Sequence, residues 1–146
     1  MTVYRITREQ YANELTASGK AGRWNLSDQY VIYASSSRSL ATLELLVSTS
    51  GIYPEGSYKV MVIEIPDDFK EILLSDLKTD WRNFTSYPLL QNIGSDWYIN
   101  KTDLVLSVPS AVVPQEYNFL LNTQHPDFAS AVHLIEVEDY FWDERL

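Results

Sequence analysis

The stretch from Gly22 to Val47, GRWNLSDQYVIYASSSRSLATLELLV, decides the fold predicted for this chain. Residues 30–34 (YVIYA) form a short run of residues that favour a β-strand. The serines at 35–37 offer hydroxyl groups that can cap a helix, and a helix is predicted to begin near Arg38. The stretch therefore predicts a strand, a helix cap and a helix in succession.

A single carboxylate, Glu44, interrupts the apolar run at 40–47 (LATLELLV). On a helix, residues 40, 43, 44 and 47 have the spacing i, i+3, i+4, i+7 of one stripe that faces the core. A carboxylate in that stripe must be paired, hydrogen-bonded or open to a cleft, because burying it without a partner is costly. Glu44 is therefore a candidate functional residue.

Two arginines are candidate groups for binding an anion. Arg23 follows Gly19 and Gly22 on the approach to the predicted strand. Glycine lets the backbone come close to a ligand, and a guanidinium group matches the geometry of phosphate oxygens. Arg5 lies in a first predicted strand at residues 2–7, where it faces either a cleft or solvent at an edge of the sheet.

Ser110 follows a continuous apolar run at 104–108 (LVLSV), which is typical of a strand buried on both faces. The end of such a strand holds a side chain rigidly, so Ser110 either orients a ligand or catalytic neighbour, or closes a turn after proline. The chain has no G-x-S-x-G motif, which disfavours serine as a nucleophile. The two histidines, His125 and His133, are too few and too poorly spaced to predict a metal site.

The other predicted elements follow from periodicity and from turn residues. We expect a short helix at 7–15, a turn-rich connection at 50–56, a strand at 58–65, a helix at 88–101 in which Gly94 packs closely against a neighbour, and a last strand at 131–137. Trp81, Trp97 and Trp142 are expected in the core. Strands and helices are interleaved irregularly, so the predicted fold class is α+β.

Composition limits the classes of protein that fit. A chain of 146 residues has the length of one domain, 1–146. The net charge of -9 opposes direct binding to nucleic acid. The chain lacks cysteine, a signal-peptide pattern and an apolar run of about 18 residues, so we expect a cytoplasmic protein with no membrane segment.

The chain resembles the RES domain, the toxin half of a bacterial toxin-antitoxin pair. The motifs that carry the resemblance span the whole chain: Tyr4-Arg5-Ile6, Gly22-Arg23-Trp24-Asn25, Tyr33-Ala34-Ser35, Leu43-Glu44, Ile93-Gly94 with Trp97, Val108-Pro109-Ser110-Ala111, Glu116 with Asn118, Asn122 with His125-Pro126, and Asp143-Glu144-Arg145-Leu146. The family is named for an arginine, a glutamate and a serine, which match Arg23, Glu44 and Ser110. Ala21 departs from the family, which often has a second glycine there.

The resemblance implies a fold similar to ADP-ribosyltransferases of the diphtheria-toxin type and an activity that degrades NAD. NAD is then a substrate, and no cofactor is expected. Cleavage of the bond between nicotinamide and ribose develops positive charge on the sugar, which a fixed carboxylate stabilises. The implied roles are charge stabilisation for Glu44, pyrophosphate binding for Arg23 and Arg5, orientation of the nicotinamide ring for Tyr33, and orientation of substrate or neighbours for Ser110 and Asn118.

Three functions remain open at this point. The first is an NAD glycohydrolase, and the second is an ADP-ribosyltransferase that modifies a protein with the same residues. The third is a non-catalytic binding module in which Glu44 has a structural role, such as pairing with Arg23. The resemblance also implies an antitoxin partner with an Xre-type helix-turn-helix region, which blocks the cleft and binds DNA, and a homodimer.

Overall fold

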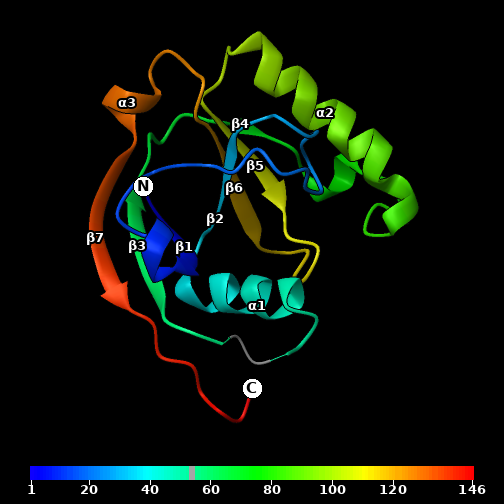
Figure 1. Ribbon diagram of the computed structural model, residues 1–146. Helices are drawn as coiled ribbons and strands as arrows, with labels where there is room; N and C mark the ends of the chain where they lie inside the picture. The colour runs from blue at the N-terminus through cyan, green and yellow to red at the C-terminus, as the bar shows by residue number, and fades with distance from the viewer. Residues whose placement is uncertain (53–54) are drawn as a thin grey trace.

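The computed structural model describes residues 1–52 and 55–146, and these form a seven-stranded sheet in the order β4-β5-β6-β2-β1-β3-β7 (Figure 1). The strands are β1 (Thr2–Arg8), β2 (Val31–Ser35), β3 (Tyr58–Glu64), β4 (Lys70–Glu71), β5 (Val105–Pro109), β6 (Tyr117–Asn122) and β7 (His133–Asp139). The helices are α1 (Arg38–Ser48), α2 (Tyr87–Asn100) and α3 (Phe128–Ala131). Neighbouring strands are antiparallel except β4 and β5, which are parallel. The α+β prediction is confirmed.

The predicted succession of strand, cap and helix is present at β2 and α1. The hydroxyl of Ser37 accepts a hydrogen bond of 3.1 Å from the backbone N–H of Leu40, which satisfies one of the free donors at the start of the helix. Leu40 is fully buried, as the stripe predicts. Val47 is 57% exposed, so the prediction that the whole stripe faces the core is wrong at its last member.

The sheet is weakly joined between β1 and β2. β1 pairs with β3 along its full length, from Thr2 opposite Glu64 to Arg8 opposite Tyr58, whereas its register with β2 consists of Tyr4 opposite Ser35. The two strands therefore diverge beyond this pair. α1 packs against both of them (Figure 1), so the space between the diverging strands is covered by a helix.

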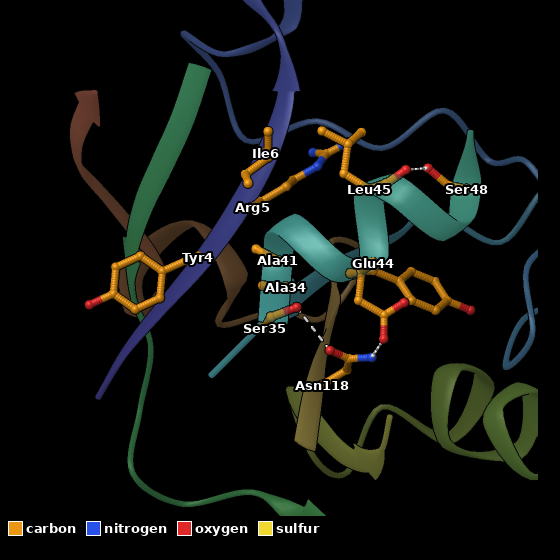
Figure 2. A pocket seen from close by; sticks show the side chains of 11 residues that line it. Tyr4, Arg5, Ile6, Ala34, Ser35, Ala41, Glu44, Leu45, Ser48 and Asn118 are labelled. Carbon is orange, nitrogen blue, oxygen red and sulfur yellow. Dashed lines mark hydrogen bonds between the residues drawn. The ribbon is translucent and has the colours of Figure 1, made fainter. Parts of the chain in front are cut away.

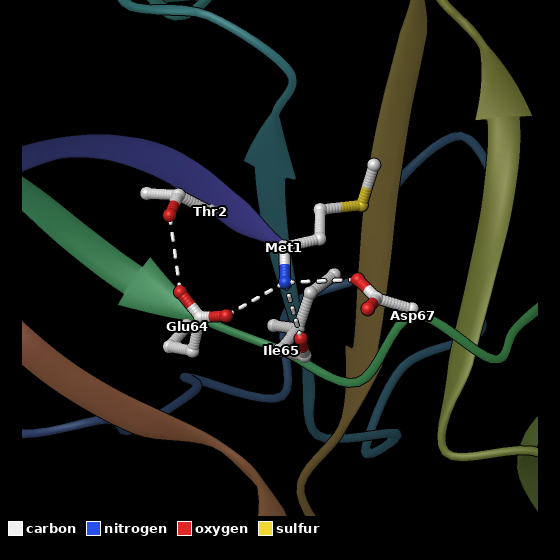
Figure 3. A network of polar contacts seen from close by, with 5 residues as sticks. All are labelled: Met1, Thr2, Glu64, Ile65 and Asp67. Carbon is white, nitrogen blue, oxygen red and sulfur yellow. Dashed lines mark hydrogen bonds and ion pairs between the residues drawn. The ribbon is translucent and has the colours of Figure 1, made fainter.

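A polar network at the start of β1 fixes that strand against β3 (Figure 3). The terminal amine of Met1 donates hydrogen bonds to Glu64 Oε1 at 2.7 Å and to the carbonyl of Ile65 at 3.0 Å, and it forms an ion pair with Asp67. The hydroxyl of Thr2 donates to the other Glu64 oxygen at 3.0 Å. These contacts hold the register of the strand that carries Arg5.

Helices α1 and α2 lie on the same face of the sheet. Leu120 of β6 packs in a cluster with Leu90 and Trp97 of α2, and Asn118 of β6 contacts Glu44 of α1. Residues 118 and 120 are two positions apart, so their side chains point to the same face.

The predicted close packing of Gly94 is confirmed, because a Cβ atom there would lie 1.6 Å from the carbonyl oxygen of Trp24. α2 thus holds the backbone of the segment that carries Arg23.

Local sequence signals failed at three places. The helix predicted at 7–15 is wrong, because β1 continues to Arg8 and only a 3-10 turn, Glu9–Tyr11, follows. The last strand begins later than predicted, because α3 occupies Phe128–Ala131. Strand β6 was not predicted at all. Residues 53 and 54 of the connection predicted at 50–56 lie outside the described residues. No helix in the described part of the chain is long and apolar enough to span a membrane.

Candidate active site

A cavity of about 240 Å³ opens where β1 and β2 diverge, and we call it the Glu44 cavity (Figure 2). Its walls come from four elements. They include Arg5 of β1, Tyr33 and Ser35 of β2, Glu44 of α1 and Asn118 of β6. The structure therefore brings together four of the residues that the sequence singles out, although they come from distant parts of the chain.

Two neutral donors hold the carboxylate of Glu44. The hydroxyl of Ser110 donates to Glu44 Oε1 at 2.7 Å, and the side-chain amide of Asn118 donates to the same oxygen at 2.8 Å. Hydrogen bonds to an ionised acceptor are roughly twice as strong as neutral ones, so this oxygen is firmly placed. Within the described residues, Oε2 has no such contact and remains available to a ligand.

The surroundings of each donor orient it toward Glu44. Ser110 Oγ already accepts from the backbone N–H groups of Val112, at 3.0 Å, and Val113, at 3.1 Å, so its proton points to Glu44. The amide oxygen of Asn118 accepts from Ser35 at 2.9 Å, which turns its NH₂ group toward the carboxylate. The position of Glu44 is therefore set before any ligand binds.

The ring of Tyr33 lines the cavity, and its hydroxyl forms hydrogen bonds within the protein. The hydroxyl donates to Asn25 Oδ1 at 2.7 Å and accepts from the backbone N–H of Trp24 at 3.0 Å. Burial raises the pKa of the phenol well above its ordinary value, so the group stays neutral. A Cβ atom at position 22 would lie 2.8 Å from both Asn25 Oδ1 and the Tyr33 hydroxyl, so a side chain there would displace these two groups.

Arg5 and Arg23 bond to backbone carbonyls. Arg5 donates to the carbonyl of Thr16 at 3.0 Å, and burial lowers the pKa of its guanidinium, which nevertheless stays charged. Arg23 donates to the carbonyl of Arg82 at 3.1 Å and lies 4.8 Å from the ring centre of Tyr87. Within the described residues neither arginine forms an ion pair with a carboxylate. Both charges are therefore available to an anionic ligand.

Arg23 lies in a second cavity, of about 510 Å³, which we call the Arg23 cavity. It is also lined by Val47, Arg82, Ala111 and Val112. Val47 lies almost one helical turn beyond Glu44, and it is exposed because it faces this cavity. Residues 111 and 112 directly follow Ser110, the donor to Glu44. The Ser110–Glu44 hydrogen bond thus joins the walls of the two cavities, while Arg23 and Glu44 do not pair.

Three residues of the site were not found from the sequence. Asn25 was part of a quoted motif, but its buried amide and its contact with Tyr33 gave no local signal. Ser35 was expected as a helix cap, whereas Ser37 is the cap and Ser35 orients Asn118. Arg82 follows a segment with ambiguous periodicity. No group of three or more metal-ligating side chains lies together in the described part of the chain.

Comparison with known proteins places the chain in a family. A family model described as the RES domain matches residues 2–143. The chain is 34% identical to the protein named Toxin Res of Yersinia enterocolitica serotype O:8, over 100% of this chain and 99% of that protein. It is 35% identical to the Prs ADP-ribosylating toxin of Sphingobium sp., over 95% of this chain and 90% of that protein.

A solved structure extends the comparison to the fold. In the crystal structure of the MbcT-MbcA toxin-antitoxin complex of M. tuberculosis, one chain matches this fold with a TM-score of 0.77. The match has 18% sequence identity and covers 95% of this chain and 83% of the other. Because the RES model covers nearly the whole sequence and the Res toxins align from end to end, this chain belongs to the RES domain family.

Proposed function

We propose that the protein is the toxin of a toxin-antitoxin pair and that it degrades NAD by cleaving the bond between nicotinamide and ribose. The observation that carries this proposal is the Glu44 carboxylate, which is held through one oxygen by Ser110 and Asn118. Its second oxygen faces a cavity that also contains the guanidinium of Arg5 and the ring of Tyr33.

Cleavage of the nicotinamide–ribose bond is favoured by a fixed negative charge beside the ribose. As the glycosidic bond breaks, its electron pair leaves with nicotinamide, and positive charge develops on the sugar. Glu44 stabilises this charge and accepts a hydrogen bond from a ribose hydroxyl through Oε2. Because Ser110 and Asn118 have already oriented the carboxylate, little reorganisation is needed in the transition state. Water then adds to the sugar carbon and loses a proton.

The rest of the substrate binds to the cations and the aromatic ring. Arg5 and Arg23 hold the diphosphate, since a guanidinium without a carboxylate partner favours phosphate oxygens. The neutral Tyr33 packs its ring against nicotinamide, while its hydroxyl keeps the segment directly after Arg23 in place. Nicotinamide leaves as a neutral base, so the reaction does not need a general acid.

A second reaction is supported by one relative. The Prs ADP-ribosylating toxin of Sphingobium shares 35% of aligned residues with this chain. The same cleavage with a protein nucleophile in place of water would transfer ADP-ribose to that protein. The solved neighbour is a toxin-antitoxin complex, which supports an antitoxin partner for this chain. We propose an antitoxin with an Xre-type helix-turn-helix region that covers the cavities, and a homodimeric toxin.

The decisive experiment is to incubate the purified chain with NAD and to identify the products by NMR. A glycohydrolase releases nicotinamide and ADP-ribose in equal amounts without an added protein. A transferase releases nicotinamide only when an acceptor is present, and the acceptor gains the mass of one ADP-ribosyl group. A folded chain that leaves NAD intact in both reactions would refute the enzymatic proposal and favour a non-catalytic module.

Expression in bacteria gives an independent test of the same proposal. The chain should arrest growth while cellular NAD falls, and co-expression of the antitoxin should prevent both effects. Growth arrest at constant NAD would favour transfer to a protein. Normal growth with folded toxin present would contradict the toxin assignment.

A further inference from the structure

A third cavity, of about 530 Å³, lies beside Arg23 and has mainly apolar walls, and we call it the Phe84 cavity. It is lined by Gly22, Phe84, Tyr87 and Pro88, among others. Phe84 is 81% exposed, and its ring centre lies 5.0 Å from that of Tyr87. The exposed ring of Phe84 and the half-buried ring of Tyr87 therefore form one aromatic surface.

The Phe84 cavity and the Arg23 cavity share a wall. Arg23 lines one cavity and lies over the ring of Tyr87, which lines the other. Arg82 of the Arg23 cavity is separated from Phe84 by one residue. The side chain of Gln91 donates to the carbonyl of Gly22 at 2.9 Å, which fixes the remaining side of this wall. An extended ligand can therefore occupy both cavities.

Arg82 adds a second cation at this junction. Its Nε donates to the carbonyl of Ala111 at 2.8 Å, and its own carbonyl accepts from Arg23. Within the described residues, no ion pair with a carboxylate neutralises either guanidinium, although the chain as a whole has a net charge of -9. Two guanidinium groups next to the exposed Phe84 and the half-buried Tyr87 fit a diphosphate attached to a nucleobase, because phosphate binds the cations and the base stacks on the rings.

We propose that residues 82–88 bind the adenosine diphosphate half of the substrate. Arg82 joins Arg5 and Arg23 in holding the diphosphate, and Phe84 with Tyr87 takes the adenine ring. This inference rests on the proposed function, in which the Glu44 cavity takes the nicotinamide riboside half. It adds a rule for specificity: the enzyme selects the dinucleotide NAD over nicotinamide mononucleotide, which has the same scissile bond but no adenine.

Binding of ADP-ribose, measured by calorimetry, tests the site without any turnover. Phe84→Ala should weaken binding about fivefold to a hundredfold, as expected for the loss of base stacking, and Phe84→Trp should restore it. Arg82→Ala should also weaken binding, and Arg82→Lys should recover only part of the affinity. Phe141→Ala is the matched control, since Phe141 is 83% exposed and lies outside all three cavities, and it should bind as the wild type does.

Kinetics with two substrates separate this inference from the proposed function. Phe84→Ala should raise KM for NAD and leave kcat/KM for nicotinamide mononucleotide unchanged. Unchanged affinity for ADP-ribose in Phe84→Ala, or an equal loss with both substrates, would overturn the adenine site. If Phe84→Ala weakens only antitoxin binding, the ring belongs to a protein interface instead. A wild type that binds ADP-ribose through Phe84 but leaves NAD intact would refute the proposed reaction and retain the site.

Discussion

Replacing Glu44 by glutamine separates the charge of this side chain from its shape. The amide oxygen of glutamine can still accept from Ser110, now at 2.7 Å, and from Asn118, now at 2.8 Å, so the local geometry should survive. What disappears is the negative charge beside the ribose. Loss of one preorganised electrostatic group costs about 2.7–4 kcal/mol in the transition state, which corresponds to about a 10²–10³-fold fall in kcat. KM for NAD should change little, because the charge acts in the transition state.

Stability should respond much less than activity. Two charge-assisted hydrogen bonds become neutral ones, at a cost of about 1 kcal/mol each, and the relief of a half-buried carboxylate offsets this cost. We expect a Tm within about 4 °C of the wild type, or higher.

The assay measures NAD turnover and thermal midpoint on one preparation, with Glu136→Gln on the exposed face of β7 as the charge-matched control. Full activity in Glu44→Gln, or inactivity that is explained by unfolding, would refute the catalytic role.

Three further substitutions examine the groups around Glu44. Arg23→Ala should raise KM for NAD about tenfold to a hundredfold. Arg23→Lys should recover only part of the loss, since lysine lacks the planar fork of the guanidinium. An unaltered KM in steady-state kinetics would contradict the diphosphate site. Tyr33→Phe keeps the ring but removes the acceptor for the Trp24 N–H, so urea unfolding should show a loss of about 1–3 kcal/mol while kcat per folded molecule is retained. Ser110→Ala should lower both kcat and the free energy of unfolding, because a fully buried hydroxyl that orients Glu44 is lost, and a normal kcat would place Ser110 outside the catalytic machinery.

The parts of the fold that the sequence predicts are those with local causes. A serine cap followed by apolar residues specifies α1, and a run of residues with high β-strand propensity specifies β2. The helix expected at 7–15 fails for the opposite reason. Thr7 and Gln10 have the spacing of a helix-capping box. This local pattern competes with the ladder between β1 and β3, which pairs Arg8 with Tyr58, and the ladder prevails.

The candidate site depends on contacts that local patterns do not contain. Glu44 receives its two hydrogen bonds from Ser110 and Asn118, which lie 66 and 74 positions further along the chain. Asn118 reaches it only because β6 lies between β5 and β2 in the sheet. The importance of Glu44 follows from a carboxylate in an apolar stripe. Ser110 followed from its place after a buried strand, with a turn role left open, and Asn118 came only from family resemblance. Neither a local sequence pattern nor a family motif pointed to Arg82 and Phe84, so these two residues are identified from the structure alone.

The contact between Gly94 and the carbonyl of Trp24 has a consequence for the genetics of a toxin. Any side chain at position 94 would collide with backbone, and the backbone it would displace carries Arg23. Cells that survive forced expression of the toxin are those in which a mutation has inactivated it. Sequencing such survivors should therefore recover replacements of Gly94 alongside replacements of Glu44, although position 94 lines none of the three cavities.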